Sequence, residues 1–210
     1  MIGNRDNWLR LALCCGLGLA GMPGSAATCP DGVEATRQGV VVTYDDGTVS
    51  SYRRGPDAMV DEVTLFEAGG SDGYGVVSFH GLYLVEEYDL VDGEKDLDEV
   101  ERQSFAAGLK ALPVPAPGLN WTGAAEVTFG VAAAIPREIS LTIGLPEQVL
   151  YGACSYESWP ALLRHRDAVE DYRLGFDYLP ALGIAVLRSY AEEGAPAESY
   201  VPVAIAAAIP

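Results

Sequence analysis

The sequence has few histidines and none of the short motifs that usually mark a catalytic centre. His80 and His165 are the two histidines among 210 residues, and no HExxH, CxxC, GxSxG or P-loop pattern is present. We therefore expect no catalytic residue, no metal ion and no cofactor. A hydrolase whose site is assembled from distant residues stays open as an alternative. We interpret His80 as the cap of a strand end and His165, which lies between two arginines, as exposed.

Basic residues are also scarce. The chain has 13 Lys and Arg against 30 Asp and Glu, which gives a net charge of −17. Such a balance excludes nucleic acid and anionic membrane surfaces as partners, because both are bound through Lys and Arg. The acidic side chains are densest in residues 86–101, where aliphatic residues interrupt them and the spacing differs from a calcium-binding loop. We expect this run to form a solvated strand edge or an exposed loop.

The longest apolar run lies at the N-terminus and has the pattern of a secretory signal. Arg5 and Arg10 are followed by the apolar residues 11–20 and by Ser-Ala-Ala at 25–27. The run is shorter than the roughly 20 apolar residues that span a membrane. We predict a signal peptide over residues 1–27, and a periplasmic or secreted protein with no transmembrane segment after cleavage.

Two cysteines, Cys29 and Cys154, lie beyond the predicted signal peptide. Two cysteines in an oxidising compartment usually pair, so we predict a Cys29–Cys154 disulfide. In the chain-entropy model a bridge across a loop of this size stabilises the protein by roughly 4–5 kcal/mol. The alternative is a reactive thiol, which would need a nearby base.

The remaining chain alternates between β-forming runs and glycine or proline turns. Residues 40–54 predict a hairpin, since three valines, Thr43 and Tyr44 precede an Asp46-Gly47 turn. A proline-rich stretch over 113–118 cannot form a central strand and is interpreted as a connector. These features predict one mainly β domain over residues 28–210 with little helix.

Two segments with a similar residue pattern suggest how this domain is built. Residues 81–88 and 183–190 share a pattern of glycine, aliphatic residues, two polar residues and tyrosine. We interpret this as a duplication with pseudo-repeats at about 33–112 and 119–210. Each repeat would form a meander with one apolar face to bury. The predicted fold is therefore a single-domain antiparallel sandwich or a partly open barrel built from two pseudo-repeated meanders.

Residues 148–190 also carry a resemblance to a group of known proteins. This segment contains a cysteine–tyrosine strand at 154–156 and the Tyr-Leu-Pro-Ala-Leu-Gly turn at 178–183. It resembles uncharacterised exported β-rich proteins of Gram-negative bacteria. The resemblance implies export and a β-rich fold, and it adds no catalytic residue.

These observations favour a non-catalytic binding or envelope-associated role. A β-sandwich or barrel can hold an apolar ligand between its walls. The alternative is a protein-interaction module that uses sheet edges or aromatic residues such as Trp121 and Trp159, with an envelope protein as its partner. A deep cavity would favour the first of these roles.

Overall fold

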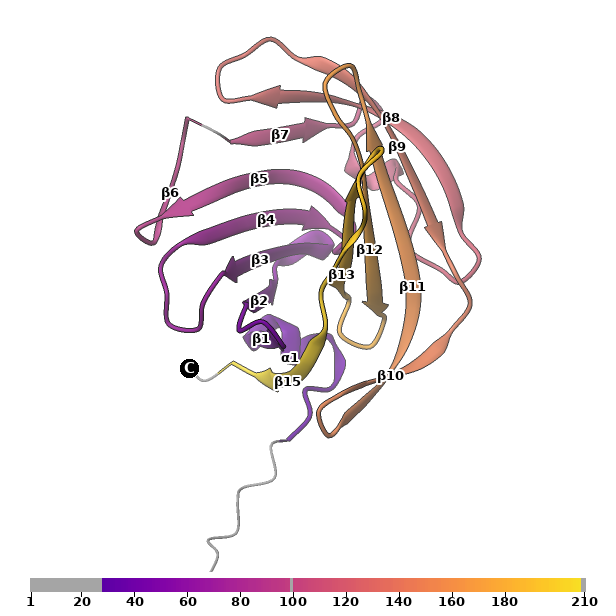
Figure 1. Cartoon of the computed structure of the whole chain (residues 1–210). Coiled ribbons are helices and arrows are strands. Elements are labelled where there is room, and N and C mark those ends of the chain that lie inside the picture. The colour runs from indigo at the N-terminus through magenta and orange to yellow at the C-terminus, as the bar shows by residue number, and fades with distance from the viewer. Residues whose placement is uncertain (1–27, 99, 209–210) are drawn as a thin grey trace, which may run out of the picture.

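The computed structural model of the protein describes residues 28–98 and 100–208 (Figure 1). The predicted signal peptide, residues 1–27, lies outside the described residues. Within the described part of the chain, no helix has the length and apolar character needed to cross a membrane.

The described residues form a short helix, two 3₁₀ turns and fifteen strands. The N-terminal elements are α1 (Gly32–Gln38), β1 (Val40–Tyr44), β2 (Val49–Arg54), the 3₁₀ turn Pro56–Ala58, β3 (Met59–Leu65), β4 (Gly73–Phe79), β5 (Tyr83–Val91), β6 (Glu94–Lys95), β7 (Glu101–Ser104) and the 3₁₀ turn Leu109–Ala111. The C-terminal elements are β8 (Asn120–Phe129), β9 (Ile135–Ile143), β10 (Glu147–Tyr151), β11 (Cys154–Arg166), β12 (Asp171–Leu179), β13 (Ile184–Glu192), β14 (Glu198–Ser199) and β15 (Pro202–Ala207).

All these strands belong to one antiparallel sheet that is not closed into a barrel. Its order is β14-β13-β12-β11-β9-β8-β7-β5-β4-β3-β2-β1-β15, and β6 and β10 pair with β5 and β11 outside this order. The mainly β antiparallel class predicted from the sequence is confirmed. The sheet curls, so that β2 to β5 form one wall and β11 to β13 form a second wall facing it (Figure 1).

The core fills the places where the two walls meet. Leu82, Leu84, Ile184 and Val186 are all buried, and they belong to the two clusters of apolar side chains or lie beside them. The starts of β5 and β13 are buried on both faces, since the neighbouring Tyr83 and Ala185 are buried as well. Their burial holds the two walls together at the end where they meet.

The glycine turns that begin the two similar segments contact each other at the end of the molecule where the walls meet. Gly81, in the turn after β4, has a φ of 74°, and a Cβ atom there would lie 3.2 Å from the Cα atom of Ile184. Gly183, in the turn after β12, has a φ of 67°. A side chain at Gly81 would therefore both strain the backbone and push the two turns apart.

The side chains beyond these turns do not take matching positions. The ring of Tyr88 covers Gly75 on the outer face of the sheet, whereas Tyr190 faces the space between the walls. The duplication stays a prediction.

The disulfide expected from the cysteine count is present and joins the chain start to the second wall. Around it, the Tyr156 hydroxyl donates to the Pro30 carbonyl at 2.9 Å. Helix α1 was not expected from the sequence. It has seven residues, and the buried Thr36 hydroxyl donates to the Leu182 carbonyl, so tertiary contacts rather than periodicity stabilise it.

Candidate functional site

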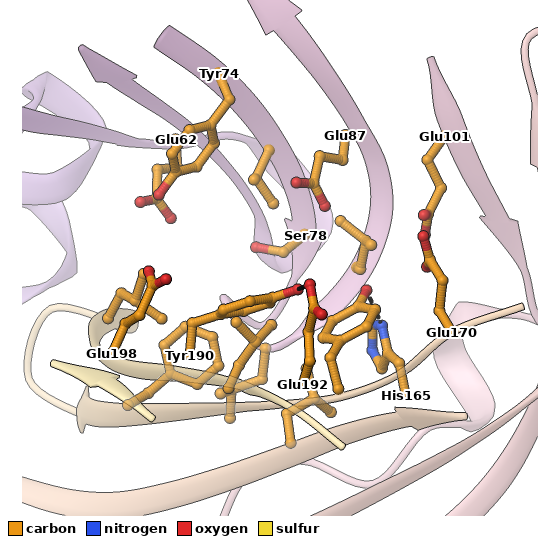
Figure 2. A pocket seen from close by; sticks show the side chains of 18 of the residues that line it. Glu62, Tyr74, Ser78, Glu87, Glu101, His165, Glu170, Tyr190, Glu192 and Glu198 are labelled. Carbon is orange, nitrogen blue, oxygen red and sulfur yellow. Dashed lines mark hydrogen bonds between the residues drawn. The ribbon is translucent and has the colours of Figure 1, made fainter. Parts of the chain in front are cut away.

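A cavity of about 910 Å³ lies between the two walls. Strands β3, β4 and β5 contribute residues from one wall, and β11, β12 and β13 contribute residues from the other. Figure 2 shows side chains from both walls converging on this space. Its volume is in the range of cavities that hold small organic ligands, which span about 300–1,000 Å³.

The end of the cavity next to the glycine turns is apolar. Leu84 lines it from β5, and Phe176 of β12 lies opposite Leu187 of β13 in the sheet register. Leu163 of β11 pairs with Leu174 of β12 one step further along the strands. This end can therefore bury an aliphatic or aromatic group of a ligand.

Further from the turns, the same strands present phenols and carboxylates. Along β13 the cavity-facing residues run from Leu187 through Tyr190 to Glu192, and along β12 they run from Phe176 to Tyr172. The acidic residues that line the cavity are Glu62, Glu87, Glu101, Glu170, Asp171, Glu192, Glu193 and Glu198. Among the described residues, no Lys or Arg is part of this lining. The cavity is thus amphipathic and carries negative charge.

Two of these carboxylates are paired with an arginine that lies behind the cavity lining. The Arg137 side chain is fully buried and donates to Glu101 at 2.6 Å, to Asp167 at 2.7 Å and to Glu170 at 2.9 Å. Three carboxylates around one guanidinium leave an excess of negative charge. The buried Arg137 guanidinium is maintained because each of its three partners accepts a hydrogen bond from it, and one of them, Glu170, remains partly exposed to water.

Glu62, by contrast, has no cationic partner in the described chain. It accepts hydrogen bonds from the Tyr52 hydroxyl and the Thr64 hydroxyl, both at 3.1 Å. Burial is the main cause that raises the pKa of Glu62 to about 7, and the hydrogen bonds only partly offset it.

Glu87 has fewer stabilising partners than Glu62. Among the described residues, no side chain donates a hydrogen bond to it and no basic group pairs with it. Burial, followed by the charges of Glu101 and Glu62, raises the pKa of Glu87 to about 7. In the sheet register Glu87 lies directly opposite Glu101 on β7. Like charges at directly opposed positions destabilise a sheet, so ionised Glu87 lowers the stability of the folded protein.

His165 also belongs to the cavity lining, and the prediction that it is exposed is wrong. Its side chain is 1 % exposed, and its Nδ1 atom lies 2.6 Å from the Tyr172 hydroxyl. The flanking Arg164 and Arg166 misled the prediction, since alternation along β11 turns their side chains to the opposite face. Burial, with the nearby charge of Arg137, lowers the pKa of His165 to about 3, so the imidazole is neutral.

The Nε2 atom of His165 has no hydrogen-bond partner in residues 28–98 and 100–208. A buried polar nitrogen left without a partner costs about 1–3 kcal/mol. His80 lies elsewhere, in the turn after β4, and does not line the cavity. Neither histidine is hydrogen-bonded to a serine among the described residues.

The expectation that residues 86–101 form a solvated strand edge or an exposed loop is confirmed for residues 92–94, 97 and 98, which are exposed, and is wrong for Glu87 and Glu101. Glu86 and Glu87 lie on β5, which pairs on both sides, and Glu101 on β7 is only 8 % exposed. Alternation along β5 explains the split. Glu86 points outward to an ion pair with Arg102, at 3.0 Å, whereas Glu87 points into the cavity.

The other residues singled out from the sequence lie away from the cavity. The Cys29–Cys154 bridge packs beside the apolar cluster under α1. Trp121 and Trp159 are partly buried against the apolar cluster that contains Leu82, Tyr83 and Leu163, and they do not line the cavity. The described residues also contain no group of three or more His, Cys, Asp or Glu side chains placed to hold a metal ion.

Comparisons of the chain with models of protein families, with curated proteins and with solved structures found no match. The functional argument therefore rests on the chemistry of the cavity.

Proposed function

We propose that this protein is a non-catalytic binding protein for a small organic cation that also has an apolar portion. The observation that carries the proposal is the 910 Å³ cavity, which combines an apolar end with the carboxylates of Glu62 and Glu87, neither of which pairs with a basic side chain among the described residues. The sequence left two binding roles open, one with an apolar ligand and one with a protein partner. The carboxylates favour an amphiphile with a positive charge over a purely apolar molecule.

The environment of the carboxylates supports a cationic group. Glu62 and Glu87 are partly removed from water, so a protonated amine beside them would interact in a medium of lower dielectric constant than water. The phenol rings of Tyr74 and Tyr190 line the same space and can contact a cation through their faces. An anionic ligand would meet repulsion from the ionised carboxylates that line the cavity.

The proposal has a definite pH dependence. Glu62 and Glu87, whose pKa values are raised to about 7, carry their charges above that pH and lose them below it. A ligand amine stays protonated across this interval because its own pKa is near 10. Affinity is therefore expected to be greatest above pH 7 and to fall as the pH decreases toward 5.

Isothermal titration calorimetry with three single-chain amphiphiles tests the proposal. An alkylammonium, the alcohol and the carboxylate with the same hydrocarbon chain differ only in the head group. We expect the ammonium compound to bind most tightly and the carboxylate to bind least. Tighter binding of the alcohol or the carboxylate would overturn the cationic ligand.

A matched pair of variants links binding to the cavity. Glu87→Gln removes a cavity carboxylate, and we expect it to weaken binding of the alkylammonium on the order of tenfold. Glu147→Gln removes the same charge from an exposed position on β10, outside the cavity, and serves as the control. Equal loss in both variants would mean that the overall negative charge, rather than the cavity, attracts the cation.

We also propose that the protein acts outside the cytoplasm, in the periplasm or after secretion. The signal-like pattern of residues 1–27 and the Cys29–Cys154 disulfide support this location. The intact mass of protein recovered from the periplasm or the medium tests it. A mass that retains residues 1–27 would contradict export with cleavage after Ala27.

A further inference from the structure

We propose that the cationic group of the ligand is a methylated, quaternary ammonium, and that a small side pocket beside the cavity holds it. This inference rests on the proposed function and deepens it, because it names the chemical class of the head group. The side pocket has a volume of about 80 Å³. It is lined by Tyr44, Thr48, Ser50, Thr64, Phe66, Tyr74, Leu187 and Tyr200.

The side pocket adjoins the large cavity, because Tyr74, Leu187 and Tyr200 line both spaces. Leu187 lies opposite Phe176 in the sheet register, and Phe176 belongs to the apolar end of the cavity. A ligand with its head group in the side pocket can therefore lie over Leu187 with its apolar portion directed toward Phe176. The volume is several times the roughly 10–15 Å³ that one water molecule needs, so a group of four heavy atoms such as trimethylammonium is of suitable size.

Four aromatic rings line the side pocket in two contacting pairs. The rings of Tyr44 and Tyr200 meet at 79° with their centroids 6.4 Å apart, and the rings of Phe66 and Tyr74 meet at 49° with their centroids 6.3 Å apart. Neither pair is stacked face to face, so ring carbon remains to line the space. Several aromatic rings around one small space are the arrangement by which proteins recognise quaternary ammonium groups, since the ring faces carry partial negative charge.

Most of the hydroxyl groups around the side pocket already have hydrogen-bond partners or are closed to solvent. The Thr64 hydroxyl donates to Glu62 at 3.1 Å, so the Ser50 hydroxyl, which lies 2.6 Å from the Thr64 oxygen, donates to Thr64. The Tyr200 hydroxyl donates to Glu198, and the Tyr44 hydroxyl is buried. A primary ammonium would bring three N–H donors to a lining with few free acceptors, which is unfavourable away from water. A quaternary ammonium has no N–H donor and avoids this penalty.

The negative charge of Glu62 lies close to the side pocket. Glu62 accepts the hydrogen bond from Thr64, which is a lining residue, and Figure 2 shows Glu62 beside Tyr74. Burial, followed by the charge of Glu62, raises the pKa of both Tyr44 and Tyr74, and the charge of Glu87 adds to the effect on Tyr74. A cation in the side pocket would be attracted by this charge without a direct hydrogen bond. The charge therefore favours a methylated ammonium over a neutral group of the same shape.

Isothermal titration calorimetry with three compounds of the same hydrocarbon chain length tests the head group. One compound ends in a trimethylammonium group and the second in a primary ammonium group. The third ends in a tert-butyl group, which has the shape of trimethylammonium without its charge. We expect the trimethylammonium compound to bind the native protein most tightly, on the order of tenfold more tightly than either of the others.

Substitutions of the rings assign this preference to the side pocket. Phe66→Leu removes a ring that is 56 % exposed, and Tyr200→Leu removes a second ring. Each should reduce the advantage of trimethylammonium over primary ammonium several-fold, whereas Tyr200→Phe, which retains the ring, should keep most of it. Tyr88→Leu removes a ring that lines neither space and should keep the full advantage. Thermal unfolding followed by circular dichroism verifies that each variant is folded before titration.

The outcomes separate this inference from the function on which it rests. If the primary ammonium compound binds the native protein as tightly as the trimethylammonium compound, and both bind more tightly than the tert-butyl compound, the side-pocket inference is wrong and the organic-cation function stands. If neither cation binds more tightly than the tert-butyl compound, both are wrong. If the advantage of trimethylammonium persists unchanged in Phe66→Leu and in Tyr200→Leu, the side pocket does not hold the head group and the inference is overturned.

Discussion

Replacing Glu87 with glutamine should make the protein more stable at alkaline pH. In the folded protein, burial and the charges of Glu101 and Glu62 raise the pKa of Glu87 from 4.5 to about 7. At about 1.4 kcal/mol for each pKa unit, ionising this group costs the folded state about 3 kcal/mol. Glutamine keeps the size of the side chain and removes the charge. We therefore expect the Glu87→Gln variant to gain about 2–3 kcal/mol in free energy of unfolding above pH 8.

The sign of the effect defines its pH window. A carboxyl whose pKa is raised by folding contributes stability below its unfolded pKa of 4.5 and loses that contribution as the pH rises through about 7. The native protein should thus lose stability across this interval relative to Glu87→Gln, and the two should differ least at about pH 4.

Urea unfolding at a series of pH values measures this difference directly. Glu147→Gln, at an exposed position, should give a difference that changes little with pH. A Glu87→Gln variant that is less stable than the native protein at about pH 8.5, or a gain that is the same at every pH, would refute the reasoning.

Three further predictions concern the framework that holds the cavity. Reduction of the Cys29–Cys154 bridge, which has a sequence separation of 125, should lower the free energy of unfolding by about 4–5 kcal/mol; an unchanged urea midpoint would contradict this. Leu84→Asp and Val186→Asp each place a charge in the buried region, so circular dichroism should show that both variants are unfolded. Arg137→Met leaves three carboxylates without their guanidinium and should cost about 3–5 kcal/mol in urea unfolding. Stability equal to that of the native protein would show that the carboxylates simply take up protons.

Local patterns in the sequence predicted the strands and the cross-link. The valine-rich run and the Asp46-Gly47 turn define the hairpin of β1 and β2, since alternation and turn chemistry depend only on neighbouring residues. The pairing of Cys29 with Cys154 followed from their number and from the export predicted for the chain. Helix α1 lacked such a signal because its stability comes from contacts with a turn 146 residues away, where the Thr36 hydroxyl donates to the Leu182 carbonyl.

The cavity could not be predicted in the same way, because it depends on the order and curvature of the sheet. Glu87 and Glu101 were recognisable only as members of a charged run, and nothing local indicates that they lie opposite each other on β5 and β7. Glu192 and Glu198 reach the same space from the other wall. One signal was present in the sequence: alternation along the last residues of β11 separates His165 from Arg164 and Arg166, whereas a register shift between β4 and β5 interrupts the alternation along β5.

Strand β14 has a consequence for how a molecule enters and leaves the cavity. It contains two residues, forms one edge of the sheet and is paired with β13 only at Ser189–Ser199 and Tyr190–Glu198. Short edge strands open at a small fraction of the free energy of global unfolding, so Glu198 is carried on one of the most easily released segments of the fold. Amide hydrogen exchange at residues 198–199 should be fast in the free protein. A bound cation that contacts Glu198 would slow this exchange, and the opening rate of the strand would then set an upper limit on the rate of ligand release through this edge.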